Sequence, residues 1–449
     1  MVNELAAHQS CTIHHLGRDN KDQRSYYRFM SNKRTTESAI SQAICRLDDQ
    51  VLAGVHILSL SDTTDVDYTR SKERIGVEAG LGYIGDHRGW GYQAHVHLNV
   101  LADSGSVVGL SDVHVWHRKE KKKPRAGYRT GLKDKESYRW QQGCEHSKGV
   151  LAAAQRVTFV QDREGDLYGT FVSIPDERHE LLIRQRHNRR VLTSQGEHCL
   201  IKDYLQGVPV AGALLLPIAK GHSQHTARIA RLEVRWATVQ VMKNDKYAYE
   251  KDYPKTVSLQ VVQVKEHLSS VPEGEAPIEW CLWTTHEVET LEQAIQIVDW
   301  YCLRWLIEEL FRLLKKEGFQ LEKCELQDGY ALRKMGLLTM SAAVRVLQLK
   351  QARQGNTDLP IEAVFDEQEQ LCLSQLNPTL QGKTPALQNP HPALSLPWAA
   401  WIVARLGGWT GYASQRPPGV ITLRNGLERF DAIYVGWRLN RGDTDMYKP

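Results

Sequence analysis

The sequence lacks three patterns that would assign the protein to a special class. Its 8 cysteines are scattered and form no CxxC pair, which argues against a zinc knuckle or a disulfide framework. No apolar run approaches the ~18 residues needed to span a bilayer. The first residues, MVNELAAHQSCTIHH, lack the basic-then-apolar order of a secretory signal. These absences predict a soluble, cytoplasmic protein in a reducing compartment.

The chain also has little excess of either charge. It carries 57 Lys and Arg residues against 53 Asp and Glu residues, a net charge of +4. A uniformly basic coat is therefore excluded, and any nucleic-acid surface must be local. At ~150 residues per domain, 449 residues correspond to about three domains, or to two large ones with an insertion.

Two short apolar runs end in an acidic residue. The run VHILSL, residues 55–60, leads into Ser61-Asp62, and the run VTFV, residues 157–160, leads into Gln161-Asp162. Both have the pattern of a buried strand. From about 180 to 285, short alternating stretches are separated by polar turns, which predicts a β-rich insertion. Residues 94–110 predict a hairpin, with His95 and His97 on its polar, solvent-facing side.

Residues 290–319 give the clearest helical pattern in the chain. Within it, Tyr301, Arg304, Glu308 and Lys315 fall on one stripe at ~100° per residue. A tyrosine, two cations and one acid on a stripe suit a surface that binds phosphates and holds a metal ion. The same spacing also fits an ordinary amphipathic helix whose charges are solvated, and spacing alone favours that reading.

Three carboxylates then become candidates for one metal site. Asp62 and Asp162 each end a predicted strand, and Glu308 lies on a helix that can pack across the same sheet edge. Carboxylates without Cys or His select Mg²⁺ or Mn²⁺, and two such ions can promote phosphoryl transfer. Other acids compete for these roles: Asp65, Asp67, Glu164, Asp166 and Glu309.

These residues also carry a resemblance to a known family. LSLSDTTDVDYT (58–69), VQDREGDLY (160–168) and the spacing Tyr301-x2-Arg304-x3-Glu308-x6-Lys315 resemble the DDE transposases of bacterial insertion sequences. The closest type is the group with the YREK signature, to which the transposon-five transposase belongs. The similarity extends from SYYRFMSNKRTTESAI near the N-terminus to FDAIYVGW near the C-terminus.

The resemblance implies an α/β fold: a ribonuclease-H-like mixed sheet, an inserted antiparallel β-domain, and helical N- and C-terminal segments. Asp62, Asp162 and Glu308 would hold two Mg²⁺ or Mn²⁺ ions. The implied division is residues 1–50, a helical and shortened DNA-end-binding segment; residues 51–328, the catalytic domain; and residues 329–449, a helical domain for dimerisation. Full-length relatives have an extra arginine-rich segment that residues 1–25 do not resemble.

The resemblance also implies contacts with DNA. Tyr301, Arg304 and Lys315 would bind phosphates of the transposon end. Trp280 would stack on a flipped base, a task that needs only an aromatic face, with Trp283 as its rival and a half-buried strand position as the ordinary alternative. Four arginines of the segment IRQRHNRR could clamp phosphates, although a solvated loop is nearly as plausible for each: Arg184, Arg186, Arg189 and Arg190.

The predicted function is that of a cut-and-paste DNA transposase that cleaves transposon ends, forms hairpins and transfers strands. Its partners would be double-stranded DNA and a second copy of the chain in a paired-end complex, with no membrane. The alternative is a non-catalytic DNA-binding inhibitor of a full-length transposase. A structure-selective nuclease fits the metal site equally well but leaves the YREK stripe and Trp280 without a role.

Overall fold

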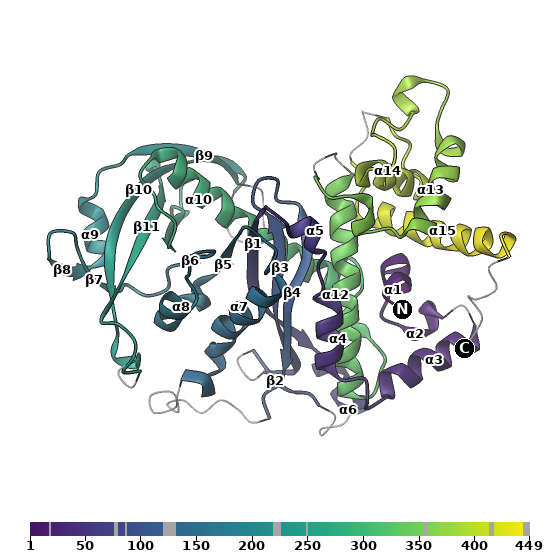
Figure 1. Ribbon diagram of the computed structural model, residues 1–449, viewed down its shortest axis with the longest axis horizontal. Helices are drawn as coiled ribbons and strands as arrows, with labels where there is room; N and C mark the ends of the chain where they lie inside the picture. Colours follow the sequence, from purple (N-terminus) through teal and green to yellow (C-terminus); the bar gives the residue numbers. More distant parts are fainter. Residues whose placement is uncertain are drawn as a thin grey trace. The chain divides into compact units, whose positions relative to one another are not determined.

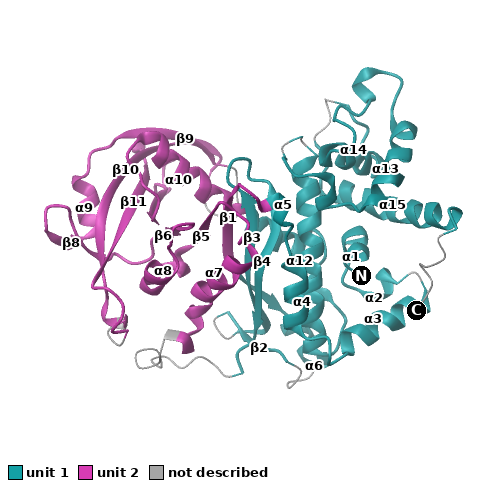
Figure 2. Cartoon of the chain, in the orientation of Figure 1, with its two compact units in different colours: residues 1–51, 63–122, 306–449 teal, residues 52–62, 123–305 magenta. Residues whose placement is uncertain are grey.

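The computed structural model describes residues 1–17, 19–75, 80–85, 88–119, 132–218, 226–247, 250–353, 355, 357–412 and 417–442. Within these ranges, fifteen α-helices and twelve strands form a mixed α/β structure (Figure 1), which confirms the predicted class. The chain divides into two units whose segments interleave along the sequence (Figure 2): residues 1–51, 63–122 and 306–449 form unit 1, and residues 52–62 and 123–305 form unit 2. In the described ranges, no helix combines the length and apolar character required to cross a bilayer.

Unit 2 is built on a mixed sheet. Its strands are β1 (His56–Asp67, of which residues 56–62 belong to this unit), β5 (Arg156–Gln161), β6 (His179–Arg184), β7 (Arg190–Leu192), β8 (His198–Leu200), β9 (Gly212–Ile218), β10 (Arg228–Met242), β11 (Thr256–Glu266) and β12 (Glu279–Thr284). They are ordered β1-β5-β6-β12-β11-β10-β7-β8, and β9 pairs with β10. The first three strands are parallel, whereas the pairings from β6 through β12 and onward are antiparallel. Strands β6 to β12 occupy the predicted β-rich stretch.

The core of unit 2 follows directly from the apolar runs. Ile57, Leu58 and Leu60 of β1 are fully buried, as are Phe159 and Val160 of β5. Buried on both faces, these strands read as nearly continuous apolar runs, as central parallel strands do. The helices of the unit are α7 (Arg139–Val150), α8 (Tyr168–Ser173), α9 (Ile201–Gly207) and α10 (Leu291–Leu303).

Unit 1 contains three further strands, β2 (Gly82–Ile84), β3 (Gly89–Leu101) and β4 (Val107–Trp116), which pair in antiparallel fashion. β3 and β4 form the predicted hairpin. The prediction that His95 and His97 lie on the surface was wrong, because both side chains are fully buried, and His95 Nδ1 lies 2.9 Å from the Thr63 hydroxyl. The alternating pattern was misleading because both faces of this part of β3 are covered.

The helices of unit 1 come from both ends of the chain. They are α1 (Val2–His8), α2 (Ile13–Leu16), α3 (Asn20–Ser31), α4 (Glu37–Ile44), α5 (Asp49–Leu52), α6 (Lys72–Ile75), α11 (Trp305–Arg312), α12 (Gly329–Ala352), α13 (Glu367–Leu380), α14 (Leu396–Leu406) and α15 (Val420–Asn440). Helix α12 is largely buried, and its Lys334 ammonium donates to the carbonyl oxygens of Met30 and Asn32 at 3.1 and 2.8 Å. Because each helix covers apolar surface of another, the two ends of the chain share one core.

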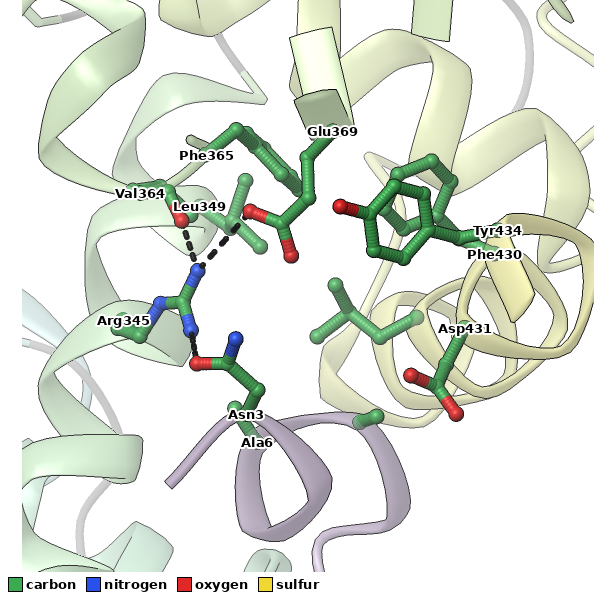
Figure 3. A pocket seen from close by; sticks show the side chains of 12 residues that line it. Asn3, Ala6, Arg345, Leu349, Val364, Phe365, Glu369, Phe430, Asp431 and Tyr434 are labelled. Carbon is green, nitrogen blue, oxygen red and sulfur yellow. Dashed lines mark hydrogen bonds and ion pairs between the residues drawn. The ribbon is translucent and has the colours of Figure 1, made fainter. Parts of the chain in front are cut away.

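A small pocket of unit 1 lies among α1, α12, α13 and α15 (Figure 3). Arg345 of α12 points into it and donates hydrogen bonds to the Asn3 side chain and the Val364 carbonyl oxygen. Its guanidinium also lies 3.7 Å from the carboxylate of Glu369. Burial raises the pKa of Glu369, and the charge of Arg345 opposes this rise. The polar contacts of Arg345 in this pocket therefore tie α1 to the C-terminal helices.

The predicted continuous helix over residues 290–319 is three consecutive segments. α10 begins at a capping box in which Thr290 and Gln293 satisfy each other's backbone amides. A turn at Arg304 separates α10 from α11, and a π-helical turn, Leu313–Glu317, follows. Because the ~100° step holds only within a regular α-helix, the predicted stripe does not extend unbroken from Tyr301 to Lys315.

Candidate nucleic-acid interface and catalytic carboxylates

Asp62 and Asp162 follow neighbouring positions of two parallel strands. Ser61 of β1 pairs with Gln161 of β5, and the two aspartates come next in the chain. The Asp162 carboxylate also caps the turn Arg163–Gly165, accepting the Glu164 amide at 2.7 Å. Asp162 directly follows the last residue of β5, as predicted, but the prediction that Asp62 ends a strand was wrong, because β1 continues to Asp67. The two carboxylates are neighbours because both strands run in the same direction and their pairing stops at Ser61 and Gln161. The structure thus brings together two of the three predicted carboxylates.

Arg304 interacts with both aspartates. Its guanidinium donates to the Asp62 carboxylate at 2.9 Å, and its charge also acts on Asp162. Burial nevertheless raises the pKa of Asp162, because the opposing capping hydrogen bond and the arginine charges are weaker than the loss of hydration. Asp162 therefore carries a negative charge that its surroundings neutralise only in part.

Glu308 and Lys315 belong to unit 1. Glu308 lies in α11, and Lys315 lies in the π-helical turn that follows. Burial lowers the pKa of Lys315, while the charges of Glu322, Asp65 and Asp67 oppose this shift. Lys315 is therefore influenced by the charges of three carboxylates of its own unit.

Tyr301, Trp280 and Arg184 form a cluster within unit 2. The Trp280 and Tyr301 rings meet edge to face with centroids 5.7 Å apart, and the Arg184 guanidinium lies 5.8 Å from the centre of the Trp280 ring. The Tyr301 hydroxyl is buried, and the Arg184 side chain interacts with it. The pKa of Tyr301 is raised by burial, against the charges of Arg304 and Arg184. A buried hydroxyl between two arginines is suited to donate to an anionic oxygen.

The two candidate tryptophans of β12 differ in their surroundings. Trp283 is fully buried and packs against Phe171, with ring centroids 6.4 Å apart. Trp280 is half-buried and lines a cleft. Trp283 is therefore a core residue, and only Trp280 has a ring that a ligand can reach without unfolding the strand.

The cleft beside Trp280 is strongly basic. It is lined by Arg163, Arg184, Arg186, Lys202, Glu279 and Trp280 among others. Its acid, Glu279, accepts a hydrogen bond from Gln263 at 3.0 Å. Sequence reasoning missed Arg163 and Lys202. Arg163 directly follows Asp162 and could have been found from that position, whereas Lys202 enters the cleft only because α9 folds back beside the loop after β6.

The remaining two predicted arginines do not line this cleft. Arg190 is exposed at the start of β7. Arg189 is buried and donates to the Asp166 carboxylate at 2.8 Å. Its guanidinium is therefore engaged inside the protein, and the geometry supports a structural role for Arg189 rather than the predicted phosphate contact.

The competing acids are engaged elsewhere. Glu164 accepts from Arg139 at 2.6 Å, and Glu309 accepts from Lys350 at 2.8 Å. Asp67 caps its own turn by accepting the Thr69 amide at 2.7 Å, and Asp65 lies with it near Lys315. Asp166 binds Arg189. Asp62 and Asp162 are also engaged, by Arg304 and by the Glu164 amide, and what distinguishes them is that they lie side by side where the pairing of β1 and β5 stops.

Comparison with protein-family models finds no match for this chain. Across the described ranges, no group of three His, Cys, Asp or Glu side chains is placed to hold a metal ion. Asp62 and Asp162 still offer hard oxygen donors of the kind that Mg²⁺ and Mn²⁺ prefer, and the incompletely neutralised charge of Asp162 fits a divalent cation. Asp62 and Asp162 are the residues that would bind one.

Proposed function

We propose that this protein is a DNA transposase of the DDE type, with a ribonuclease-H-like catalytic core. The observation that supports this most strongly is the placement of Asp62 and Asp162 side by side, just past the last paired residues of the parallel strands β1 and β5, beside a basic cleft that contains a reachable tryptophan. In this proposal, residues of unit 2 bind the DNA end and position one phosphodiester bond next to the two carboxylates.

Each side chain of the cluster has a role in the proposal. Asp62 and Asp162 would hold the divalent ion, which when bound supplies Lewis-acid polarisation of the phosphodiester. Arg304 and Arg184 bind nonbridging phosphate oxygens through charge-assisted hydrogen bonds, and the Tyr301 hydroxyl donates a third. Trp280 stacks on an unpaired base. Arg186, Lys202 and Arg163 extend the phosphate contacts along the strand.

The resemblance further implies that two copies of the chain pair two DNA ends through the helices of residues 331–449. Light scattering of the DNA complex tests this part. A mass of two chains is expected, and a mass of one chain on each DNA end would contradict it.

The central experiment incubates the protein with Mg²⁺ or Mn²⁺ and DNA that carries the sequences flanking its gene. Nicked or hairpin-ended product is expected from the wild type and from Asp252→Asn, which changes an exposed carboxylate of unit 2. No product is expected from Asp162→Ala. Binding without cleavage by the wild type would refute the enzyme and favour the inhibitor. Equal cleavage by Asp162→Ala would refute the assigned site.

A further inference from the structure

Asp166 is a fully engaged buried carboxylate four residues after Asp162. It is 2% exposed. One oxygen accepts the Arg189 Nε at 2.8 Å, and the other accepts the backbone amides of Arg186 and His187 at 2.8 and 3.0 Å. Arg189 also donates to the Asp166 carbonyl oxygen at 2.7 Å. The Asp166 carboxylate thus holds the segment that follows β6 both by its backbone, at Arg186 and His187, and by the side chain of Arg189.

The segment Gln185–Arg189 is fixed at further points by its backbone. The Gln185 amide donates to the Cys281 carbonyl oxygen at 2.7 Å, and the Arg189 carbonyl oxygen accepts the Ile201 amide at 3.0 Å. The Asn188 side chain accepts the Lys202 amide at 3.1 Å. Hydrogen bonds therefore tie the segment to β12 at one end and to the first turn of α9 at the other, and Asp166 holds its middle.

The cations of the cleft sit on or beside this segment. Arg184 immediately precedes it, Arg186 lies within it, and Lys202 is tied to it through Asn188. A buried ion pair adds little net stability compared with well-packed apolar residues, whereas its directional hydrogen bonds specify one backbone conformation. The conformation specified here is the one that directs three cations toward one cleft.

We propose that the Asp166–Arg189 pair is a positioning element for nucleic-acid binding. It holds the segment Gln185–Arg189 in the shape that presents Arg184, Arg186 and Lys202 to consecutive phosphates of one DNA strand. Asp166 also follows the turn that Asp162 caps, so the same pair fixes these cations relative to a catalytic carboxylate. This inference rests on the proposed function of the cleft.

The test is a double-mutant cycle on DNA binding, measured by fluorescence anisotropy of a labelled duplex at several salt concentrations. Asp166→Asn removes the charge and one acceptor while keeping the size of the side chain. It should weaken binding at least roughly tenfold and lower the salt slope by about 1, because a misplaced cation no longer displaces counterions. Arg186→Ala should weaken binding of the wild type similarly but have less than about a twofold effect in the Asp166→Asn background.

A matched control separates positioning from general destabilisation. Glu266→Gln disrupts another buried ion pair of unit 2, formed with Arg228 at 2.8 Å and located in the β10–β11 region. It should lower the urea midpoint without changing DNA affinity or the salt slope. Arg189→Lys keeps the cation but cannot donate at once to the carboxylate and to the backbone carbonyl oxygen of Asp166, and it should give an intermediate slope if Asp166→Asn fails to fold.

The outcomes distinguish the two proposals. If the wild type binds DNA but Asp166→Asn and Arg186→Ala act additively, or if Glu266→Gln lowers affinity as much as Asp166→Asn, the positioning inference is refuted and the function stands. If the wild type and the Glu266→Gln control show no salt-dependent DNA binding, the proposed function fails and the inference fails with it.

Discussion

The two tryptophans of β12 should respond differently to replacement by alanine. Trp283→Ala should mainly lower stability, whereas Trp280→Ala should mainly lower the affinity for DNA. Trp283 is fully buried against Phe171, so Trp283→Ala leaves a large cavity and should lower the free energy of unfolding by about 3–5 kcal/mol. Trp280 is half-buried. Its alanine variant loses an edge-to-face contact with Tyr301, worth about 0.5–1.5 kcal/mol, and a contact with Arg184 worth roughly 0.5–1 kcal/mol.

For DNA binding, Trp280→Ala should have the larger effect. Stacking of a base on an aromatic side chain contributes about 1–3 kcal/mol, which corresponds to a loss of roughly 5- to 150-fold in affinity for Trp280→Ala. Trp280→Phe keeps an aromatic face and should retain most of the affinity. Trp283→Ala should bind normally at temperatures where it remains folded.

Urea titration followed by circular dichroism gives the stabilities, and anisotropy with a duplex containing one unpaired base gives the affinities. A fully paired duplex is the matched control, because it offers no free base and should show a smaller effect of Trp280→Ala. If Trp280→Ala lowers stability as much as Trp283→Ala and binds both duplexes like the wild type, the assignment of the two tryptophans is refuted.

Three further predictions concern other parts of the structure. Asp162→Asn should abolish cleavage yet leave the urea midpoint unchanged or higher, because it removes a charge that burial disfavours; a lower midpoint would contradict this. Burial lowers the pKa of His286 to about 3, so its contribution to stability is complete above about pH 6.5 and is lost as pH falls toward 3, at up to about 1.4 kcal/mol per pH unit. The stability difference between wild type and His286→Gln should therefore shrink between pH 6.5 and 4 in urea titrations, and a constant difference would contradict it. Arg345→Met leaves Glu369 buried without its cation (Figure 3) and should cost about 3 kcal/mol in the same assay, whereas pairing it with Glu369→Leu should restore part of that loss.

The sequence was most informative where one local pattern decides the structure. The apolar runs that end at Asp62 and Asp162 predicted two buried strands, and the alternation before Gly105 predicted the β3–β4 hairpin. In each case the signal lies within about ten residues and the physical cause is burial of one continuous stretch. Asp62 and Asp162 could be found for the same reason, because a polar residue after a buried run stands out, but the end of the apolar run before Asp62 is not the end of β1, which continues to Asp67.

The sequence was least informative where contacts between distant residues decide. His95 and His97 follow the alternation of a solvent-exposed face but are covered by other parts of the chain, which periodicity within β3 cannot reveal. Arg189 resembles the neighbouring arginines of its basic stretch, yet among them it is the one whose side chain pairs with Asp166. Lys202 has no local signal, since only the fold of α9 brings it to Trp280. The break at Arg304 likewise lies within a pattern that looks fully helical.

The interleaved segments of the two units have a consequence for synthesis on the ribosome. Unit 2 requires nothing after residue 305, whereas unit 1 combines the first 51 residues with residues 306–449. Unit 2 can therefore fold as soon as residue 305 has emerged, while helices α1 to α4 wait for α12 and α15 before their apolar faces are covered. During that interval the nascent N-terminal helices expose hydrophobic surface to chaperones. A ribosome stalled once residue 305 has emerged from the exit tunnel should present a protease-resistant unit 2 and a protease-sensitive N-terminus.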